Sequence, residues 1–387
     1  QHYIAFNSFC TSKEETERIK NVINKLQKVF VTIFMGLLTG MAILLICMSK
    51  QQFSASERRR LSLVPKLTAD SIEDKTYMNS MEEYLLDHFP FREQFRRIKA
   101  YYAYGVLQQK ENNGIYVAEG YAGKLEYPLQ QSSVEKACAR MMALQEQYFP
   151  DAQTYYAIVP DKNYYLAKQN GFPAMDYNEM EQIMQHKLPT MSYIPLWDTL
   201  AIEDYYHTDT HWRQERLHNV LERLGEYMDF SIDMTHMSAQ TVMPFYGVYY
   251  GQSALPMQPD TLYYLTDETI EAASVWNLEK NRTDDIYQQN ILNEENVVDK
   301  YDIFMGGAAP VQVITSPKAQ TGRKLIIFRD SFTSSLAPLL SEVYHEIILI
   351  DARYIASSLL GEYVDFSNAD VLFLYNTILL NHASMLK

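Results

Sequence analysis

Cysteine is scarce in this 387-residue chain, which contains only three copies. Cys10 and Cys47 lie near the N-terminus, so Cys138 is the one cysteine in the long remainder. That remainder cannot contain a disulfide of its own, and its stability must come from a hydrophobic core. Cysteine usage therefore excludes a disulfide-rich fold, although it does not identify a compartment.

Basic residues are scarce after position 60. Nine of the 34 Lys and Arg and four of the 48 Asp and Glu fall in residues 1–60, which leaves 25 basic against 44 acidic residues downstream. The acidic part has no basic stripe, which argues against a nucleic-acid partner. The same charge disfavours the capture of a highly anionic polymer by electrostatics alone.

Charge is absent from residues 29–48, which are mostly apolar and long enough to cross a bilayer as a helix. A 28-residue tail precedes them and no small-x-small cleavage site follows, so we interpret them as a signal anchor. Basic residues are nearly balanced on the two sides and do not decide the orientation. We expect a single-pass membrane protein with its main domain outside the cytoplasm, in contact with the bilayer through residues 29–48.

The sequence pattern predicts four regions. They are a tail (1–28), the anchor (29–48), a membrane-proximal linker with helices (49–110) and an α/β domain (111–387). Helical spacing is expected on both sides of Pro90 and over 134–149, and strands over 154–159 and 192–197. Residues 236–300 are rich in loops and aromatic residues, with short strands.

The last 64 residues alternate between strand and helix patterns. Strands are predicted over 324–328, 346–351 and 370–375, and helices over 333–343 and 354–363. This alternation predicts a parallel sheet with helices on both faces. Polar residues follow the strands, namely Ser331, Asp351 with Arg353, and Asn376, and we expect them at the carboxyl edge of the sheet, where ligands bind.

Two distant segments contain the side chains of a serine hydrolase. The apolar run 324–328 is followed by Arg329-Asp330-Ser331 and then by a helix pattern, which places a hydroxyl near backbone N–H groups able to receive an oxyanion. Asp209 and His211 offer a base and the carboxylate that orients it. Together the two segments predict nucleophilic catalysis.

These residues also have simpler interpretations. Asp330 and Ser331 suit a helix N-cap, and His211 alone would more often be a half-buried core histidine. His207 and His211 are spaced as zinc ligands on a helix, but Thr-Asp-Thr between them is a poor helix interior and no third ligand is apparent. We therefore expect no metal and no cofactor at this site.

The segment Asp209-Thr210-His211-Trp212 resembles the motif that names the DHHW protein family, and it is similar to the SGNH-hydrolase-like domain of the alginate O-acetylation proteins. The resemblance covers most of residues 50–387. Its further landmarks, in chain order, are Phe53-Ser54-x-x-Glu57-x-Arg59, Tyr84-Leu85-x-Asp87-x-Phe89-Pro90-Phe91-Arg92, Val159-Pro160-Asp161-Lys162, Tyr246-Gly247-x-Tyr249-Tyr250, Tyr301-Asp302-x-Phe304-x-Gly306-Gly307, Arg329-Asp330-Ser331-Phe332 and Asp351-Ala352-Arg353-Tyr354.

This resemblance implies a flavodoxin-like, SGNH-type fold with Asp209, His211 and Ser331 as the catalytic triad. It also implies acetyl transfer to an exported polysaccharide, with a membrane-bound O-acyltransferase as partner. The family usually has Asn after the paired glycines, where this chain has Ala308. The N–H groups of Ser331 and of Gly306 or Gly307 would then have to stabilise the oxyanion, and losing one donor typically costs about 100- to 1000-fold in turnover.

The sequence leaves the function open between two classes. The first is an O-acetyltransferase or esterase of cell-surface polysaccharide, in which Arg353 either orients an acidic sugar or forms a structural ion pair. The second is a non-catalytic accessory that binds glycan or scaffolds the acyltransferase, which fits Ala308, the anchor and the 30 tyrosines. Lipid-ester hydrolysis is disfavoured because no amphipathic lid is apparent.

Overall fold

The computed structural model describes residues 13–48, 50–54, 56–293 and 299–387. The first twelve residues of the predicted tail, including Cys10, lie outside the described part. The chain forms two compact units. The first unit consists of the chain up to Phe53 together with Arg60–Phe95. The second unit consists of Ser54–Arg59 together with Arg96–Lys387.

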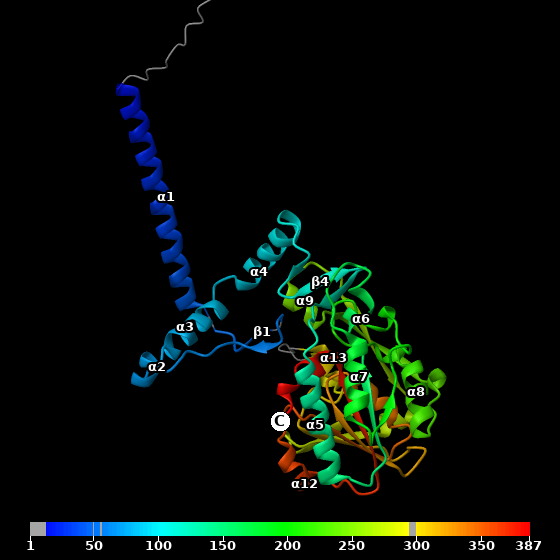
Figure 1. The fold of residues 1–387 in the computed structure, drawn as a ribbon. Coiled ribbons are helices and arrows are strands. Elements are labelled where there is room, and N and C mark those ends of the chain that lie inside the picture. The colour runs from blue at the N-terminus through cyan, green and yellow to red at the C-terminus, as the bar shows by residue number, and fades with distance from the viewer. Residues whose placement is uncertain (1–12, 49, 55, 294–298) are drawn as a thin grey trace, which may run out of the picture. The chain divides into compact units, whose positions relative to one another are not determined.

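The first unit contains the apolar N-terminal helix α1 (Lys13–Cys47), drawn in dark blue in Figure 1. Its segment Glu17–Cys47 is long and apolar enough to cross a membrane, and none of its most apolar window is buried in the protein. Such a helix is consistent with a signal sequence or an anchor. Helices α2 (Ala69–Glu73) and α3 (Thr76–Asp87) follow, and α4 (Arg92–Tyr101) begins after the predicted break at Pro90.

The second unit is built on an eight-stranded mixed sheet. Its strands lie in the order β11-β10-β12-β14-β13-β15-β6-β7, and the five from β14 to β7 are parallel. Their bounds are β6 (Thr154–Val159), β7 (Ser192–Ile194), β10 (Ser274–Asn277), β11 (Arg282–Asp285), β12 (Val311–Thr315), β13 (Lys324–Arg329), β14 (Glu346–Ile350) and β15 (Ala369–Asn376). The sequence thus located the parallel strands to within about three residues.

The prediction of a wholly parallel sheet was wrong at one edge. Strands β10, β11 and β12 are antiparallel to their neighbours, and β12 pairs with β14. The connection from β10 to β11 is residues 278–281, too short for the crossover that parallel neighbours require. The α/β fold is therefore mixed but mainly parallel.

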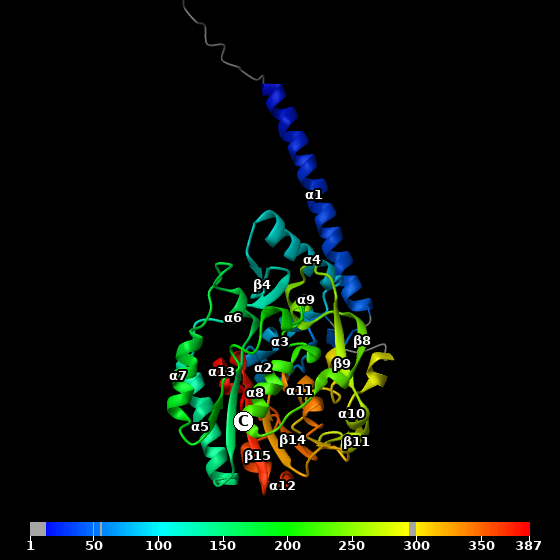
Figure 2. The same cartoon turned by 90° about the vertical axis from the view of Figure 1, so that its right-hand side faces the viewer.

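Helices pack on both faces of this sheet. Apolar side chains of β13 point alternately to the two faces, so each face offers an apolar surface to the helices. Leu325 and Ile327 join the core beneath α8 (His218–Met228) and α11 (Thr333–Leu340). Ile326 and Phe328 join the opposite core with α5 (Gln131–Tyr148) and α7 (Tyr177–Lys187). Figures 1 and 2 show α5 and α7 side by side along one face.

The predicted helix 354–363 is much shorter than expected. A 3₁₀ turn (Ser357–Leu359) leads into α12 (Leu360–Tyr363). Asp351 accepts hydrogen bonds from the backbone N–H and the guanidinium of Arg353, which holds this stretch in a turn and delays the helix.

Smaller elements complete the chain. A three-stranded antiparallel sheet precedes α5, and β8 pairs antiparallel with β9. The remaining bounds are β1 (Phe53–Ser54), β2 (Arg59–Arg60), a π-helix (Tyr102–Val106), β3 (Glu111–Asn112), β4 (Ile115–Ala118), β5 (Tyr121–Lys124), α6 (Lys162–Leu166), β8 (Ser238–Phe245), α9 (Val248–Ser253), β9 (Asp260–Thr266), α10 (Glu268–Ala272), α13 (Thr377–Asn381) and short 3₁₀ turns at 202–204, 214–216, 234–236, 289–293, 300–303 and 383–385.

Candidate active site

Ser331 lies where the sequence predicted, between the end of β13 and the start of α11. The preceding residue, Asp330, is buried and fixes this turn with both carboxylate oxygens. It accepts from the N–H of Phe332 at 3.0 Å and from the N–H of Asn376 at 2.6 Å. Asp330 therefore joins the carboxyl ends of β13 and β15 and positions the half-buried Ser331.

Asp209, His211 and Ser331 form one hydrogen-bonded chain. His211 Nε2 lies 2.8 Å from Ser331 Oγ, and His211 Nδ1 lies 2.5 Å from Asp209 Oδ1. With Nδ1–H donated to the carboxylate, Nε2 is the acceptor for the serine proton. This is the arrangement of a nucleophile, a general base and an orienting carboxylate.

Aromatic residues hold the imidazole of His211 in this orientation. The ring of Tyr301 stacks on it with centroids 4.0 Å apart and planes 5° from parallel. The indole N–H of the adjacent Trp212 donates to Phe332 O at 2.9 Å and approaches Ser335 Oγ at 3.0 Å. Tyr301, which stacks on His211, also donates to Ser335 Oγ, so both Trp212 and Tyr301 are bonded to α11.

The carboxylate of Asp209 is fully buried and has several donors. Val248 N–H donates to its Oδ2 at 2.8 Å, and Arg58 Nη1 donates to the same oxygen at 3.1 Å. Burial alone would raise the pKa of Asp209, but the charge and hydrogen bond of His211, together with Arg58, hold it well below its usual value. Asp209 is therefore ionised at neutral pH and can stabilise a protonated His211. Sequence reasoning missed Arg58, because 151 positions separate it from Asp209.

Gly247 allows a second segment to enclose the aspartate. The Gly247 N–H donates to Thr208 Oγ1 at 2.8 Å, and the N–H of Tyr249 donates to Thr208 O at 3.0 Å. A Cβ at position 247 would lie 2.3 Å from Asp209 Cα, inside the van der Waals limit. The landmark Tyr246-Gly247-x-Tyr249-Tyr250 thus requires glycine at position 247 to pack against the segment that contains Asp209.

The Gly247→Ala substitution is expected to lower the free energy of unfolding by at least about 2 kcal/mol and to reduce turnover strongly, because Asp209 must move to admit the methyl group. Gly322→Ala is the matched control, since a Cβ there meets no atom within 4 Å. Denaturant unfolding and ester hydrolysis measured on both variants check the expectation. Equal behaviour of the two variants would contradict this packing account.

Lys162 also contacts the segment that contains Asp209. Its ammonium is buried and donates to the carbonyl oxygens of Tyr206 at 2.8 Å and His207 at 3.2 Å. Burial lowers the pKa of Lys162 to about 7, although the carboxylates of Asp209 and Asp260 oppose the shift. The lysine therefore fixes the backbone that leads into Asp209.

This buried lysine predicts a specific pH dependence of stability. Between about pH 7 and pH 10 the unfolded chain keeps the Lys162 proton that the folded chain has lost, so the free energy of unfolding rises with pH, by at most about 1.4 kcal/mol per unit. In Lys162→Met this contribution to the slope disappears, whereas the exposed control Lys168→Met keeps it. Denaturant titrations at pH 7, 8 and 9 measure the slopes. Parallel slopes for Lys162→Met and wild type would show that Lys162 is charged throughout.

Ser331 opens onto a cavity of about 390 Å³. Arg353 contributes to its wall while its Nε and Nη2 atoms donate to Asp351 at 2.8 and 2.6 Å. The other lining residues are Lys124, Thr210, Tyr249, Gln252, Asp330, Phe332, Asn376, Ile378, Leu379, His382 and Met385. The triad therefore faces a space with several polar side chains.

The paired glycines lie elsewhere. Gly306 N–H donates to Asp302 O at 2.9 Å, Gly307 N–H donates to Phe304 O at 3.3 Å, and neither residue lines the cavity of Ser331. Both have positive φ, and a Cβ on Gly307 would lie 2.7 Å from Asp302 Oδ1, so the turn requires glycine. In the described part of the chain, no oxygen accepts from the Ser331 N–H, which leaves that group available as an oxyanion donor.

His207 and His211 do not share a site. His207 Nδ1 lies 3.1 Å from Asp260 Oδ1, and its ring stacks on Tyr121. The two histidines, although spaced like zinc ligands in the sequence, therefore pair with different carboxylates, His207 with Asp260 and His211 with Asp209.

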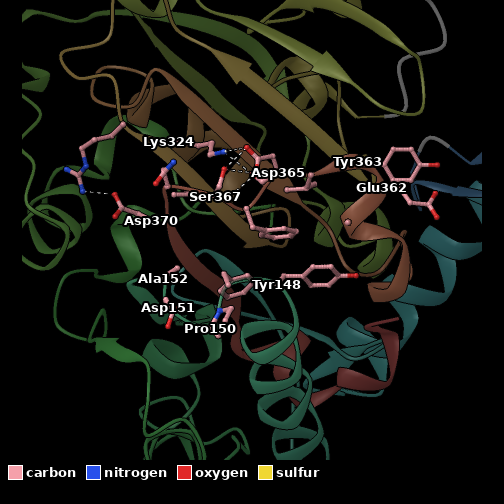
Figure 3. A pocket seen from close by; sticks show the side chains of 17 residues that line it. Tyr148, Pro150, Asp151, Ala152, Lys324, Glu362, Tyr363, Asp365, Ser367 and Asp370 are labelled. Atoms are coloured by element: carbon pink, nitrogen blue, oxygen red, sulfur yellow. Dashed lines mark hydrogen bonds and ion pairs between the residues drawn. The ribbon is translucent and has the colours of Figure 1, made fainter.

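A second hollow, of about 1050 Å³, contains none of the predicted site residues (Figure 3). Its wall includes Lys324 and Asp370 at the amino ends of β13 and β15. Ser331 follows the carboxyl end of β13, so the two cavities lie at opposite ends of the parallel strands. The predicted site residues Ser331 and Arg353 line the smaller one.

Comparison with solved structures supports this fold. A DHHW family protein from Eubacterium siraeum is 19% identical with a TM-score of 0.57, over 70% of this chain and 93% of that one. Bacillus cereus PatB1 carrying a sulfonyl adduct is 18% identical with a TM-score of 0.53, over 69% and 95% of the two chains. The O-acetyltransferase domain of Pseudomonas putida AlgJ is less similar, at 12% identity and a TM-score of 0.40 over 69% and 92%. Curated protein sequences gave no match.

Residues 200–350 match the family described as DHHW protein, and this range contains Asp209, His211 and Ser331. The protein from Eubacterium siraeum, which shares the fold, has the same family name. Residues 200–350 of the chain are thus similar to the DHHW protein family.

Proposed function

We propose that this protein is a membrane-anchored serine acyltransferase that moves acetyl groups to or from hydroxyls of a cell-surface or exported polysaccharide. The observation that carries the proposal is the continuous chain from Ser331 Oγ through His211 to the buried Asp209, with distances of 2.8 and 2.5 Å. Its end at Ser331 opens on a cavity with polar walls. In this proposal the fold is of the flavodoxin-like SGNH type.

The reaction has two steps. Ser331 Oγ attacks the carbonyl carbon of an acetyl ester while His211 Nε2 takes the serine proton, and Asp209 stabilises the resulting imidazolium. The tetrahedral oxyanion receives a hydrogen bond from the Ser331 N–H, and its collapse expels the alcohol, which takes the proton back from His211. A sugar hydroxyl then attacks the acetyl-serine with His211 again as base, and free Ser331 returns.

The lining of the cavity supports the proposed acceptor class. Lys124, Gln252 and Arg353 are hydrogen-bond donors suited to sugar hydroxyls or a uronate carboxylate. Two donor atoms of Arg353 are fixed on Asp351, and no hydrogen bond within the described chain uses its Nη1. We assign Arg353 to substrate orientation through that free edge.

The helix α1 supports the proposed location. We propose that it anchors the protein in the membrane with the second unit outside the cytoplasm, and that a membrane-bound O-acyltransferase supplies acetyl groups. Arg58, whose side chain contacts Asp209, lies ten positions after residue 48, where the proposed anchor ends.

Acetyl transfer is tested with the full chain in detergent, p-nitrophenyl acetate as donor and soluble polysaccharides as acceptors. Release of nitrophenol with new O-acetyl groups on the polymer supports a transferase, and release with free acetate alone supports an esterase. Binding of polymer without nitrophenol release would contradict catalysis and favour a glycan-binding accessory, which the absence of Asn at Ala308 also fits.

A further inference from the structure

A second cluster of potential ligands lies outside the cavity of Ser331. His236 ends a 3₁₀ turn before β8, Asp267 lies between β9 and α10, and Glu342 follows α11. One ligand atom from each residue lies within 4.8 Å of the other two. His236 Nε2 and Asp267 Oδ2 are 3.2 Å apart.

Glu342 is the distinctive member of this cluster. The residue is only 5% exposed, and in the described part of the chain its Oε1 has no hydrogen-bond partner. A buried carboxylate oxygen without a donor is costly, and native proteins usually pair such atoms with a proton, a donor or a cation. The side chains of Asp267 and Thr269 lie close to the Glu342 carboxyl group, and a cation between the three ligand atoms would supply the partner that Oε1 lacks.

Asp267 is already oriented for ligation. Its Oδ1 accepts the N–H groups of Thr269 and Ile270, both at 2.9 Å, as the N-cap of α10. These bonds fix the carboxylate and leave Oδ2 toward His236. Outer hydrogen bonds of this kind commonly orient metal-binding carboxylates.

We propose that His236, Asp267 and Glu342 bind one zinc ion through Nε2, Oδ2 and Oε1. One imidazole nitrogen and two carboxylate oxygens form a donor set that suits Zn²⁺ better than Mg²⁺ or Ca²⁺, which prefer oxygen alone. Zinc–ligand distances of about 2.0–2.2 Å place tetrahedral ligand atoms about 3.4 Å apart. The three ligand atoms, which lie within 4.8 Å of one another here, would therefore move slightly closer on binding. Water supplies the fourth ligand.

The ion would have a structural role. His236 and Asp267 lie at the base of the β8–β9 hairpin, and Glu342 lies just beyond the end of α11, the helix that begins two residues after Ser331. Zinc would therefore join this hairpin to the helix of the nucleophile. The competing occupant is a proton, because burial and the nearby carboxyl of Asp267 raise the pKa of Glu342 to about 7.

The test uses the untagged full chain in detergent, cleared of metal with a chelator and titrated with zinc sulfate at pH 7.5. Calorimetry is expected to give one zinc per chain, and the melting temperature is expected to rise with zinc concentration. Glu342→Gln and His236→Ala should each weaken this binding at least tenfold. His218→Ala is the matched control, because it removes a surface histidine from a comparable pair with Glu222 and should leave the affinity unchanged.

Two outcomes would overturn the inference. Wild-type protein that binds no zinc up to about 100 µM would assign the cluster to a shared proton. Glu342→Gln and His236→Ala that bind zinc as tightly as wild type would place the ion elsewhere, for example on the pairs formed by His207 or His382. Binding is measured without any acyl substrate, so either result is independent of the proposed acyl transfer.

Discussion

Replacing Ser331 with alanine is expected to lower p-nitrophenyl acetate turnover by at least about a thousandfold, to the level of the uncatalysed reaction plus binding effects. The hydroxyl is the only group that His211 Nε2 contacts at hydrogen-bond distance in the described chain, so no neighbouring side chain can take over the attack. The fold should survive, because Asp330 fixes the turn through the backbone of Phe332 and Asn376.

Ser367→Ala is the matched control for this experiment. Ser367 is exposed, and within the described residues its hydroxyl group donates to the carboxylate of Asp365 alone. It should retain full turnover and the same melting temperature. Equal activity of Ser331→Ala and wild type, with both proteins folded, would assign the chain to the accessory class.

Removing Arg58 is expected to have the second largest effect. Its guanidinium donates to Asp209 and to Asp299, and also to the carbonyl oxygen of Tyr246 at 2.7 Å. Burial and the neighbouring carboxylate of Asp209 raise the pKa of Asp299 to about 8, so at neutral pH Arg58 mainly balances the charge of Asp209. Losing one partner of a buried ion pair typically costs about 3–5 kcal/mol, because the remaining charge is uncompensated.

We therefore expect Arg58→Ala to reduce kcat by about a hundredfold with little change in KM, since Arg58 positions the triad and does not contact the substrate cavity. Arg58→Lys should restore part of the loss. Arg59→Ala is the control, because that neighbouring arginine pairs with Glu57 at 3.1 Å and is more exposed.

A double-mutant cycle separates this positioning role from general destabilisation. In an Asp209→Asn background the charge that Arg58 balances is gone, so Arg58→Ala should cost little further activity. Additive losses in kcat would mean that Arg58 acts independently of Asp209. Such a result would mean that Arg58 does not influence activity through its contact with Asp209.

The local patterns in the sequence predicted much of the fold. The strand–turn–helix around Ser331, the helix at 131–148 and the strands at β6 and β15 have apolar periodicities that packing preserves. The antiparallel edge was missed because β10, β11 and β12 are short and lie in or after a loop-rich stretch, where pairing is decided by distant partners. The turn after Asp351 was missed because it depends on a local side-chain bond.

The candidate site shows the same limit. Asp209, His211 and Ser331 could be selected by residue type and by their position at the ends of elements, and the structure brings them together. Arg58 and the stacked Tyr301 could not be selected, because their roles depend on contacts across the fold. Gly306 and Gly307 were predicted as oxyanion donors, yet their N–H groups are used within a tight turn, which the residue type alone does not reveal.

The most direct test of the central claim is the mass of the protein after reaction with a serine-directed sulfonyl fluoride. We expect one adduct per chain, which peptide sequencing maps to Ser331. It should be absent in Ser331→Ala and form far more slowly in His211→Ala. An unmodified wild-type protein, or an adduct on another residue that forms at the same rate without His211, would contradict the claim that His211 activates Ser331.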